Sequence, residues 1–302
     1  MSDANEVSIV REPIAVPTVE QALRATNQHY EFPPTFFARF LDRRLKYSSG
    51  LYLTPGATLD DAQTEKLHFI AKLLDVRSGS RLLDIGCGWG SLSLFMAEEY
   101  GCRVTGVTPS RAQADHIRKC ASTIGVEGRI DVIVGPFSEV PIEVGFDAVT
   151  MVGSINHMPN QDDVLAKVHG LMHDEARLYL SESCFRSASK YKEFARRPGT
   201  LQVTEGIFGF AEMHPLSTLV RVVEDTGLSL TGVTDLTWHF KRTVNDWIER
   251  AVRERQAIED IVPGMSEPLL EYLRTTNLAW GYTTKQYALT AVRSRLGVAG
   301  LT

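Results

Sequence analysis

RLLDIGCGWG, residues 81–90, is the stretch that decides the fold of this chain. Its first half is short and apolar, which predicts a buried parallel strand over residues 81–85. Its second half places Gly86, Gly88 and Gly90 at alternate positions, directly before a helical run. Glycines at a strand-to-helix turn let backbone approach a ligand, and the new helix offers unpaired N–H groups there. The stretch therefore predicts the ligand-binding corner of a doubly wound sheet.

The same corner argues against a nicotinamide cofactor. In the dinucleotide fingerprint G-x-G-x-x-G, the third glycine comes one residue later than it does here. A nicotinamide enzyme also places an acid after its second strand to hold the ribose hydroxyls, but this chain has Val107-Thr108-Pro109-Ser110 there. Asp84, at the end of the first strand, is expected to accept hydrogen bonds from the turn or from a ligand ammonium. A nicotinamide oxidoreductase is kept as one alternative.

Strands and helices alternate along the chain, which indicates parallel βαβ units and an α/β fold. The predicted strands are 81–85, 103–107, 130–134, 146–151, 176–182, 229–235 and 285–292. The predicted helices are 59–76, 91–100, 111–124, 161–172 and 216–226, with a helical stretch from 242 to about 280 and a helix carrying Phe36, Phe37, Phe40 and Leu41 on one face. The expected organisation is an arm and helical cap over 1–75, then a main domain over 76–302 with lid insertions at about 185–215 and 242–282.

The amino-acid composition argues against several classes of protein. A chain of 302 residues with 43% hydrophobic content can bury a large core. Its 32 Lys and Arg against 37 Asp and Glu give a net charge of −5, which argues against nucleic-acid partners and anionic membranes. The four cysteines have no metal-ligand spacing, so we expect reduced thiols and no metal. With no leader and no apolar run of roughly 20 residues, we expect a cytoplasmic protein without stable membrane insertion. Whether the protein forms a homo-oligomer stays open.

Several further segments occur in a definite order: His29-Tyr30 with Phe36-Phe37, Tyr47-Ser48, LLDIGCGWG, GVTPSRAQADH (106–116), FDAVTMVGSINHM (146–158) and WHFKRT (238–243). From about residue 27 to the end, the chain resembles the cyclopropane-fatty-acid and mycolic-acid cyclopropane synthase family of S-adenosylmethionine (SAM) enzymes. The resemblance implies a Rossmann-like, seven-stranded class I methyltransferase sheet whose last strand is antiparallel, with an N-terminal helical cap and helical lid insertions. It also implies SAM as the cofactor and a small-molecule acceptor.

The resemblance also implies a set of cofactor contacts. In the family, residues matching Tyr30, Tyr47 and Ser48 close over the amino-acid end of SAM, and those matching Thr108 and Gln113 hold the nucleoside. Phe137 falls where the family caps the adenine, although the acid usual there is absent. The whole implied set is Tyr30, Tyr47, Ser48, Asp84, Gly86, Gly88, Gly90, Thr108, Gln113 and Phe137.

One departure from the family bears on the reaction. Cyclopropane synthases hold a bicarbonate ion, which deprotonates the methylated cation, with a cysteine, a glutamate, a histidine and a tyrosine. The matching positions here are Ser49, Asn156, Ser181 and Phe240. Because these residues lack the charged, anion-binding character, the hypothesis is simple methyl transfer to carbon, nitrogen or oxygen rather than ring closure. Plant N-methyltransferases of amines belong to the same wider family.

An acceptor that loses a proton needs a base near it. The candidate catalytic residues are His157, Asn156 and Glu182, and an imidazole with an ordinary pKa of about 6.5 suits this role. The candidate substrate-pocket residues are Ser49, Ser181, Phe210, His239, Phe240 and Tyr282. Structural packing is the competing interpretation for each of them. Two other functions stay open: a cyclopropane-fatty-acid-type synthase acting on an unsaturated acyl chain, and a non-catalytic SAM-binding protein.

Overall fold

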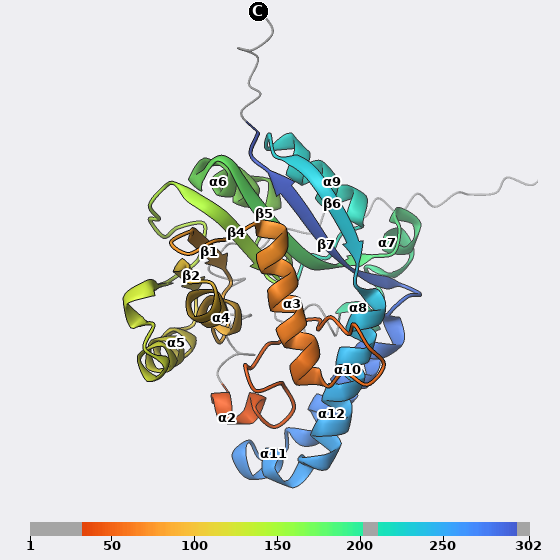
Figure 1. Cartoon of the computed structure of the whole chain (residues 1–302). Coiled ribbons are helices and arrows are strands. Elements are labelled where there is room, and N and C mark those ends of the chain that lie inside the picture. Colours follow the sequence, from red (N-terminus) through yellow and green to blue (C-terminus); the bar gives the residue numbers. More distant parts are fainter. Residues whose placement is uncertain (1–31, 202–210, 295–302) are drawn as a thin grey trace, which may run out of the picture.

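A computed structural model describes residues 32–201 and 211–294 of the chain. Within these residues, seven strands form one sheet in the order β3-β2-β1-β4-β5-β7-β6 (Figure 1). The strands are β1 (Arg81–Ile85), β2 (Arg103–Thr108), β3 (Ile130–Val134), β4 (Phe146–Val152), β5 (Met172–Phe185), β6 (Ser229–Asp235) and β7 (Thr284–Val292). Strands β1 to β5 pair in parallel, and β7 runs antiparallel to both β5 and β6. The predicted sheet, with its reversed last strand, is confirmed.

Helices cover both faces of the sheet (Figure 1). One face carries α3 (Leu59–Leu74), α4 (Ser91–Glu99) and α5 (Arg111–Ile124), and the other carries α6 (Gln161–Leu171) and α9 (Leu216–Asp225). Consecutive side chains of a strand point to opposite faces. Leu82 accordingly packs with α3 and α4, whereas Leu83 and Ile85 pack with α6 and α9. The apolar residues of β1 therefore contribute to both cores.

The remaining helices lie toward the carboxyl ends of the parallel strands. They are α2 (Pro34–Phe37), α7 (Ala188–Phe194), α8 (Pro198–Leu201), α10 (Thr237–Arg253), α11 (Arg255–Ile261) and α12 (Ser266–Ala279). In Figure 1, α2 and α10 to α12 gather at one end of the molecule. Their apolar side chains share one buried cluster, in which Phe37 of the N-terminal segment lies with Trp247 of α10 and Leu273 of α12. The cap thus combines the start of the described chain with the late insertion.

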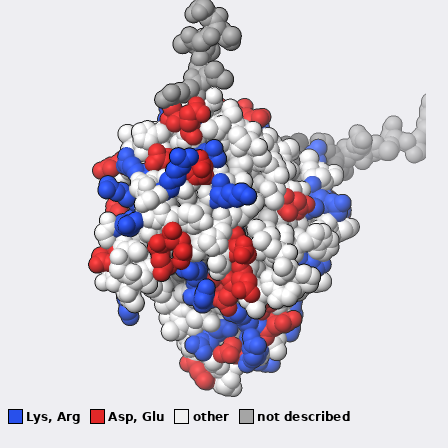
Figure 2. Space-filling view, viewed as in Figure 1, with Lys and Arg blue, Asp and Glu red and all other residues white. Residues whose placement is uncertain are grey.

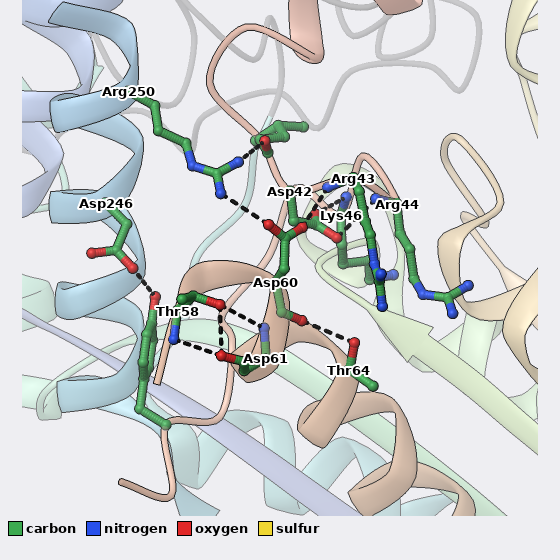
Figure 3. Close-up of polar contacts among 12 residues, drawn as sticks. Asp42, Arg43, Arg44, Lys46, Thr58, Asp60, Asp61, Thr64, Asp246 and Arg250 are labelled. Carbon is green, nitrogen blue, oxygen red and sulfur yellow. Dashed lines mark hydrogen bonds and ion pairs between the residues drawn. The ribbon is translucent and has the colours of Figure 1, made fainter. Parts of the chain in front are cut away.

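Polar contacts join the same parts of the cap (Figure 3). The Arg250 guanidinium on α10 donates to the backbone oxygen of Leu41 at 2.7 Å and to Asp60 Oδ2 at 3.0 Å. The other oxygen of Asp60 accepts from the backbone N–H of Arg43 at 2.8 Å. A single cation therefore fastens α10 to both the segment before α3 and the first turn of α3. The predicted division at residue 75 stays a prediction.

Some predicted bounds differ from the structure. The helix expected around Phe40 ends at Phe37, and the chain then turns because the Asp42 carboxylate accepts from the backbone N–H groups of Arg44 and Lys46. Strand β5 is longer than expected because it pairs with β7 as far as Phe185. The helical stretch expected from 242 begins at Thr237 and is broken into α10, α11 and α12.

Candidate active site

The three glycines of the corner serve different purposes. All three have positive φ, at +74° for Gly86, +56° for Gly88 and +83° for Gly90. A Cβ on Gly86 would lie 2.4 Å from the Cβ of Ser154, and one on Gly90 would lie 2.5 Å from Ile117 Cγ1. A Cβ on Gly88 would meet no atom within 4 Å. Gly86 and Gly90 therefore allow close packing of the turn, whereas Gly88 borders open space that a ligand can enter.

Asp84 holds the corner together. Its side chain is buried, and its two oxygens accept hydrogen bonds from Ser93 Oγ at 2.7 Å and Thr150 Oγ1 at 2.9 Å. These donors belong to α4 and to β4, on either side of the turn. We expected the Asp84 carboxylate to accept from the turn or from a ligand ammonium. In the structure it links the start of α4 to the neighbouring strand β4. Its effect on a ligand is to position the glycine turn.

Thr108 and Gln113 lie together at the end of β2. Thr108 Oγ1 donates to Gln113 Oε1 at 2.6 Å and accepts from the backbone N–H of Ser110 at 3.2 Å. Ser110 caps α5 by accepting from the Gln113 backbone N–H at 3.3 Å. Among the described residues, no acceptor is found for the Gln113 side-chain N–H groups, so these donors can serve a ligand at the strand end. Both Thr108 and Gln113 are buried.

The other side chains of the implied cofactor set are those of Phe137, Tyr47, Ser48 and Tyr30. The Phe137 ring is buried in the core with α6, and the Lys167 ammonium lies 5.0 Å from its centre. Phe137 therefore belongs to the core of the sheet. Tyr47 packs its ring 5.1 Å from that of Trp247, while Ser48 Oγ accepts from the buried Lys66 ammonium at 2.9 Å. Tyr30 lies outside the described residues.

A cavity of about 540 Å³ is lined by Gly153, and the next residue, Ser154, packs against Gly86 of the corner. Gly153, Asn156, His157 and Glu182 line it from the carboxyl ends of β4 and β5. Tyr47 and Ser48 line it from the cap. Its other walls are largely apolar and include Phe185, Phe240, Val244, Trp247, Tyr272, Leu273, Ala279, Trp280 and Tyr282. The structure thus brings all three candidate catalytic residues to one apolar space.

The six predicted pocket residues differ in where they lie. Phe240 and Tyr282 line the cavity, and Phe210 lies outside the described residues. Ser49, Ser181 and His239 are not among the residues that line this cavity. Each has a bonded partner instead: Ser49 Oγ donates to Gly50 O at 2.9 Å, Ser181 Oγ accepts from Gln286 Nε2 at 3.0 Å, and His239 Nδ1 accepts from the Tyr52 N–H at 3.1 Å.

Glu182 has a buried carboxyl in the wall of the cavity. Its carboxyl accepts from the backbone N–H groups of Ser183 at 2.9 Å and Asn156 at 3.4 Å. Burial raises the pKa of this carboxyl to about 7, although those hydrogen bonds act in the opposite direction. Asn156 shapes the turn after β4, because its side-chain amide donates to Ser183 O at 2.9 Å. His157 follows it in a short 3₁₀ turn, Ile155–His157.

Gln286 on β7 is a site residue that the sequence analysis missed. It is buried, lines the cavity, accepts from Ser183 Oγ at 2.9 Å and donates to Ser181 Oγ. No local signal marks it, because Thr284, Lys285 and Thr290 of the same strand are also polar. Gly153, which also lines the cavity, follows β4 with φ +69°.

Within residues 32–201 and 211–294, no group of three His, Cys, Asp or Glu side chains is arranged to hold a metal ion. In that same part of the chain, no helix is both long enough and apolar enough to cross a bilayer. Figure 2 shows acidic and basic side chains interspersed over the face it presents.

The sheet order, the reversed β7 and the glycine corner after β1 define a class I methyltransferase fold. The chain belongs to the mycolic acid cyclopropane synthetase family, whose family model matches residues 18–285. Among solved structures, cyclopropane synthase MmaA2 from Mycobacterium tuberculosis is similar in fold, with a TM-score of 0.82 at 22% identity, covering 93% of this chain and 100% of that one.

Two curated relatives illustrate the range of the family. A probable fatty acid methyltransferase of Pseudomonas putida is 27% identical over 241 residues, which is 79% of this chain and 61% of that protein. Probable (S)-tetrahydroprotoberberine N-methyltransferase 2 of Papaver bracteatum is 26% identical over 242 residues, covering 80% and 67%. The chain spans about half to two thirds of the length of the curated relatives it matches.

Proposed function

We propose that this protein is a SAM-dependent methyltransferase that methylates a small apolar metabolite or lipid without closing a cyclopropane ring. The observation that carries the proposal is the apolar cavity beside the glycine corner, with the Glu182 carboxyl in its wall. The names of the relatives, which refer to fatty acid, sphingolipid and tetrahydroprotoberberine methyl transfer, support an apolar acceptor.

The residues at the corner fit SAM. Open space at Gly88 admits the close approach of a ligand, and the side-chain N–H groups of Gln113 are available to donate to a nucleoside. Tyr47 and Ser48 line the cavity from the cap, and in the proposed complex they would close over the amino-acid end of SAM. SAM would supply an activated methyl group, for which a protein mainly needs to align an acceptor and exclude water. The aromatic and aliphatic walls of the cavity suit both tasks.

Glu182 is the proposed base. A carboxyl with a pKa of about 7 is partly ionised near neutral pH, so it can take up the proton that the acceptor loses. Its backbone hydrogen bonds keep it at the cavity wall. An amine, a hydroxyl or an acidic C–H would each provide such a proton. His157 lines the same cavity and is the second candidate.

The bonding at the four altered bicarbonate positions supports simple methyl transfer. The Ser49 and Ser181 hydroxyls and the Asn156 amide make hydrogen bonds within the protein, and Phe240 offers only an aromatic ring. A synthase acting on an unsaturated acyl chain is the second candidate function, because the Glu182 carboxyl is a base within the same cavity. The expected cytoplasmic location and the open question of a homo-oligomer stay predictions.

Calorimetry with SAM, S-adenosylhomocysteine and NAD, followed by incubation with methyl-labelled SAM and a panel of acceptors, tests the proposal. The panel contains apolar amines, phenols and unsaturated acyl chains. We expect binding of the two sulfur nucleosides, no binding of NAD, and a product whose NMR spectrum shows a new methyl group. A ring methylene in the product, or binding of NAD alone, would contradict the proposal. Tight binding without any labelled product would favour a non-catalytic SAM-binding protein.

A further inference from the structure

Lys46 is a buried cation that the proposed reaction has not used. It immediately precedes Tyr47 and Ser48 in the cap, and only 7% of its surface is exposed. Its backbone N–H donates to Asp42 Oδ1 at 2.7 Å. Within the described parts of the chain, its ammonium makes no hydrogen bond and no ion pair. Lys46 Nζ is not one of the fully buried polar atoms that lack a partner, so it has access to adjoining space, where an anionic group would stabilise its charge.

Three parts of the chain place ionisable groups near Lys46. They are Asp84 of β1 with the neutral Cys87 thiol of the glycine turn, Asp42 of the cap, and Lys66 of α3. The oxygens of Asp84 are engaged by Ser93 and Thr150, and those of Asp42 by backbone N–H groups. Neither acid therefore forms a direct pair with the Lys46 ammonium.

Lys66 provides an instructive contrast. It is as deeply buried as Lys46, but its ammonium donates to Ser48 Oγ at 2.9 Å and to Gln63 Oε1 at 2.5 Å. Its cost of burial is thus offset by hydrogen bonds within the protein. Burial and the neighbouring Lys46 charge lower the pKa of Lys66, so Lys46 is the cation of the two that is expected to attract an anion. Among the described residues, Lys46 is the one of the two whose ammonium has no hydrogen-bond partner.

We propose that Lys46 Nζ is the counter-ion of the carboxylate at the amino-acid end of SAM. This inference rests on the proposed function, because it takes SAM as the ligand. The carboxylate is the only anionic group of SAM, while its ammonium and sulfonium would be repelled by Lys46. A carboxylate held under the cap, between Lys46 and the glycine turn, would leave the sulfonium end directed toward the cavity that contains Glu182.

The inference predicts discrimination between two ligands that differ by one group. Decarboxylated SAM keeps the nucleoside, sulfonium and ammonium but lacks the carboxylate. A buried charge-assisted hydrogen bond corresponds to about a tenfold to hundredfold difference in Kd. The wild-type protein should therefore bind SAM more tightly than decarboxylated SAM by about that factor. In Lys46→Met the difference should shrink to about twofold or less.

The experiment is calorimetry of SAM, decarboxylated SAM and 5′-methylthioadenosine with the wild-type protein and the variants Lys46→Met, Lys46→Arg and Lys66→Met. Lys46→Arg should keep the preference for SAM because it keeps the charge. Lys66→Met should also keep it, which separates the charge of Lys46 from the general effect of removing a buried lysine. Unchanged preference in Lys46→Met would overturn the inference.

Folding failure of one variant does not leave the inference untested. Methylthioadenosine lacks the amino-acid portion, so its binding reports whether each variant keeps an intact nucleoside site. If Lys46→Met does not fold, equal affinity of the wild-type protein for SAM and decarboxylated SAM would still overturn the inference. Failure of the wild-type protein to bind any of the three nucleosides would instead contradict the proposed function.

Discussion

Glu182 Oε2 accepts a hydrogen bond from the backbone N–H of Asn156 at 3.4 Å, which joins β5 to the turn after β4. Glu182 lies on β5 and Asn156 lies in the turn after the parallel neighbour β4, and both line the apolar cavity. This contact fixes the carboxyl in place but satisfies only part of its hydrogen-bonding capacity. A carboxyl so held, with its pKa raised to about 7 by burial, is suited to accept a proton near neutral pH.

Replacing this carboxyl tests its role in turnover. Glu182→Gln keeps the size of the side chain but removes the base, so kcat/KM should fall by about 100-fold or more while S-adenosylhomocysteine binding is kept. In the wild-type protein, kcat/KM should rise as the pH passes through about 7, because the carboxyl must be ionised to accept a proton. Steady-state kinetics from pH 5 to about 9 measures both effects. His157→Gln is the comparison, and full activity in Glu182→Gln would assign the base elsewhere.

The same carboxyl should affect stability. Its pKa is raised on folding from 4.5 to about 7, so the unfolded chain releases this proton at lower pH than the folded protein does. The contribution is fully present below pH 4.5 and is lost as the pH rises through about 7, a total of about 3 kcal/mol. Urea unfolding of the wild-type protein and Glu182→Gln should show this pH-dependent loss only in the former. Parallel pH dependences would contradict the raised pKa.

The glycine corner offers a matched pair of substitutions. Gly86→Ala would place its Cβ 2.4 Å from Ser154 Cβ at positive φ, so we expect a loss of about 2–5 kcal/mol in unfolding free energy. Gly88→Ala meets open space, so its stability should fall by only about 1–2 kcal/mol while S-adenosylhomocysteine binding is lost. Chemical denaturation and calorimetry measure the two effects. Normal nucleoside binding by a folded Gly88→Ala protein would remove Gly88 from the ligand site.

The cavity can be filled without touching the corner. Ala279 at the end of α12 lines the cavity, so Ala279→Phe should exclude the acceptor and reduce kcat/KM by at least about tenfold. Binding of S-adenosylhomocysteine should be unchanged, because the substitution lies on the acceptor side. Arg274→Phe adds the same ring to an exposed position of the same helix and should leave kinetics unaltered. Equal activity of the two variants would place the acceptor elsewhere.

Arg250 provides a test of how the cap is held. Arg250→Met removes the hydrogen bonds to Leu41 O and Asp60, so the unfolding free energy should fall by about 1–3 kcal/mol. Arg253→Met, on the exposed side of the last turn of α10, should change stability by less than about 0.5 kcal/mol. Thermal and urea unfolding compare them. Similar stability of the two variants would show that the apolar cluster alone docks the cap.

Much of the fold could be predicted because its signals are local. Short windows of sequence contain each of these signals: the apolar residues of β1, the glycine turn, and the alternation of strands with amphipathic helices. Strands β1, β3 and β6 and helix α5 therefore agree with prediction at both ends. The break between α11 and α12, by contrast, interrupts an otherwise helical stretch, and the length of β5 depends on its pairing with β7.

Some features of the site depend on residues adjacent in the sequence, and others depend on residues far apart in it. By itself, the sequence determined the sheet, the glycine corner and the order of motifs that places the chain in its family, since each depends on neighbouring residues. Only the tertiary structure decided that Gly88 faces open space while Gly86 meets Ser154, or that Lys46 is buried beside Asp84 without a bonded partner for its ammonium in the described residues. The physical reason is that packing, desolvation and pairing join residues far apart in the chain, which no short stretch of sequence encodes.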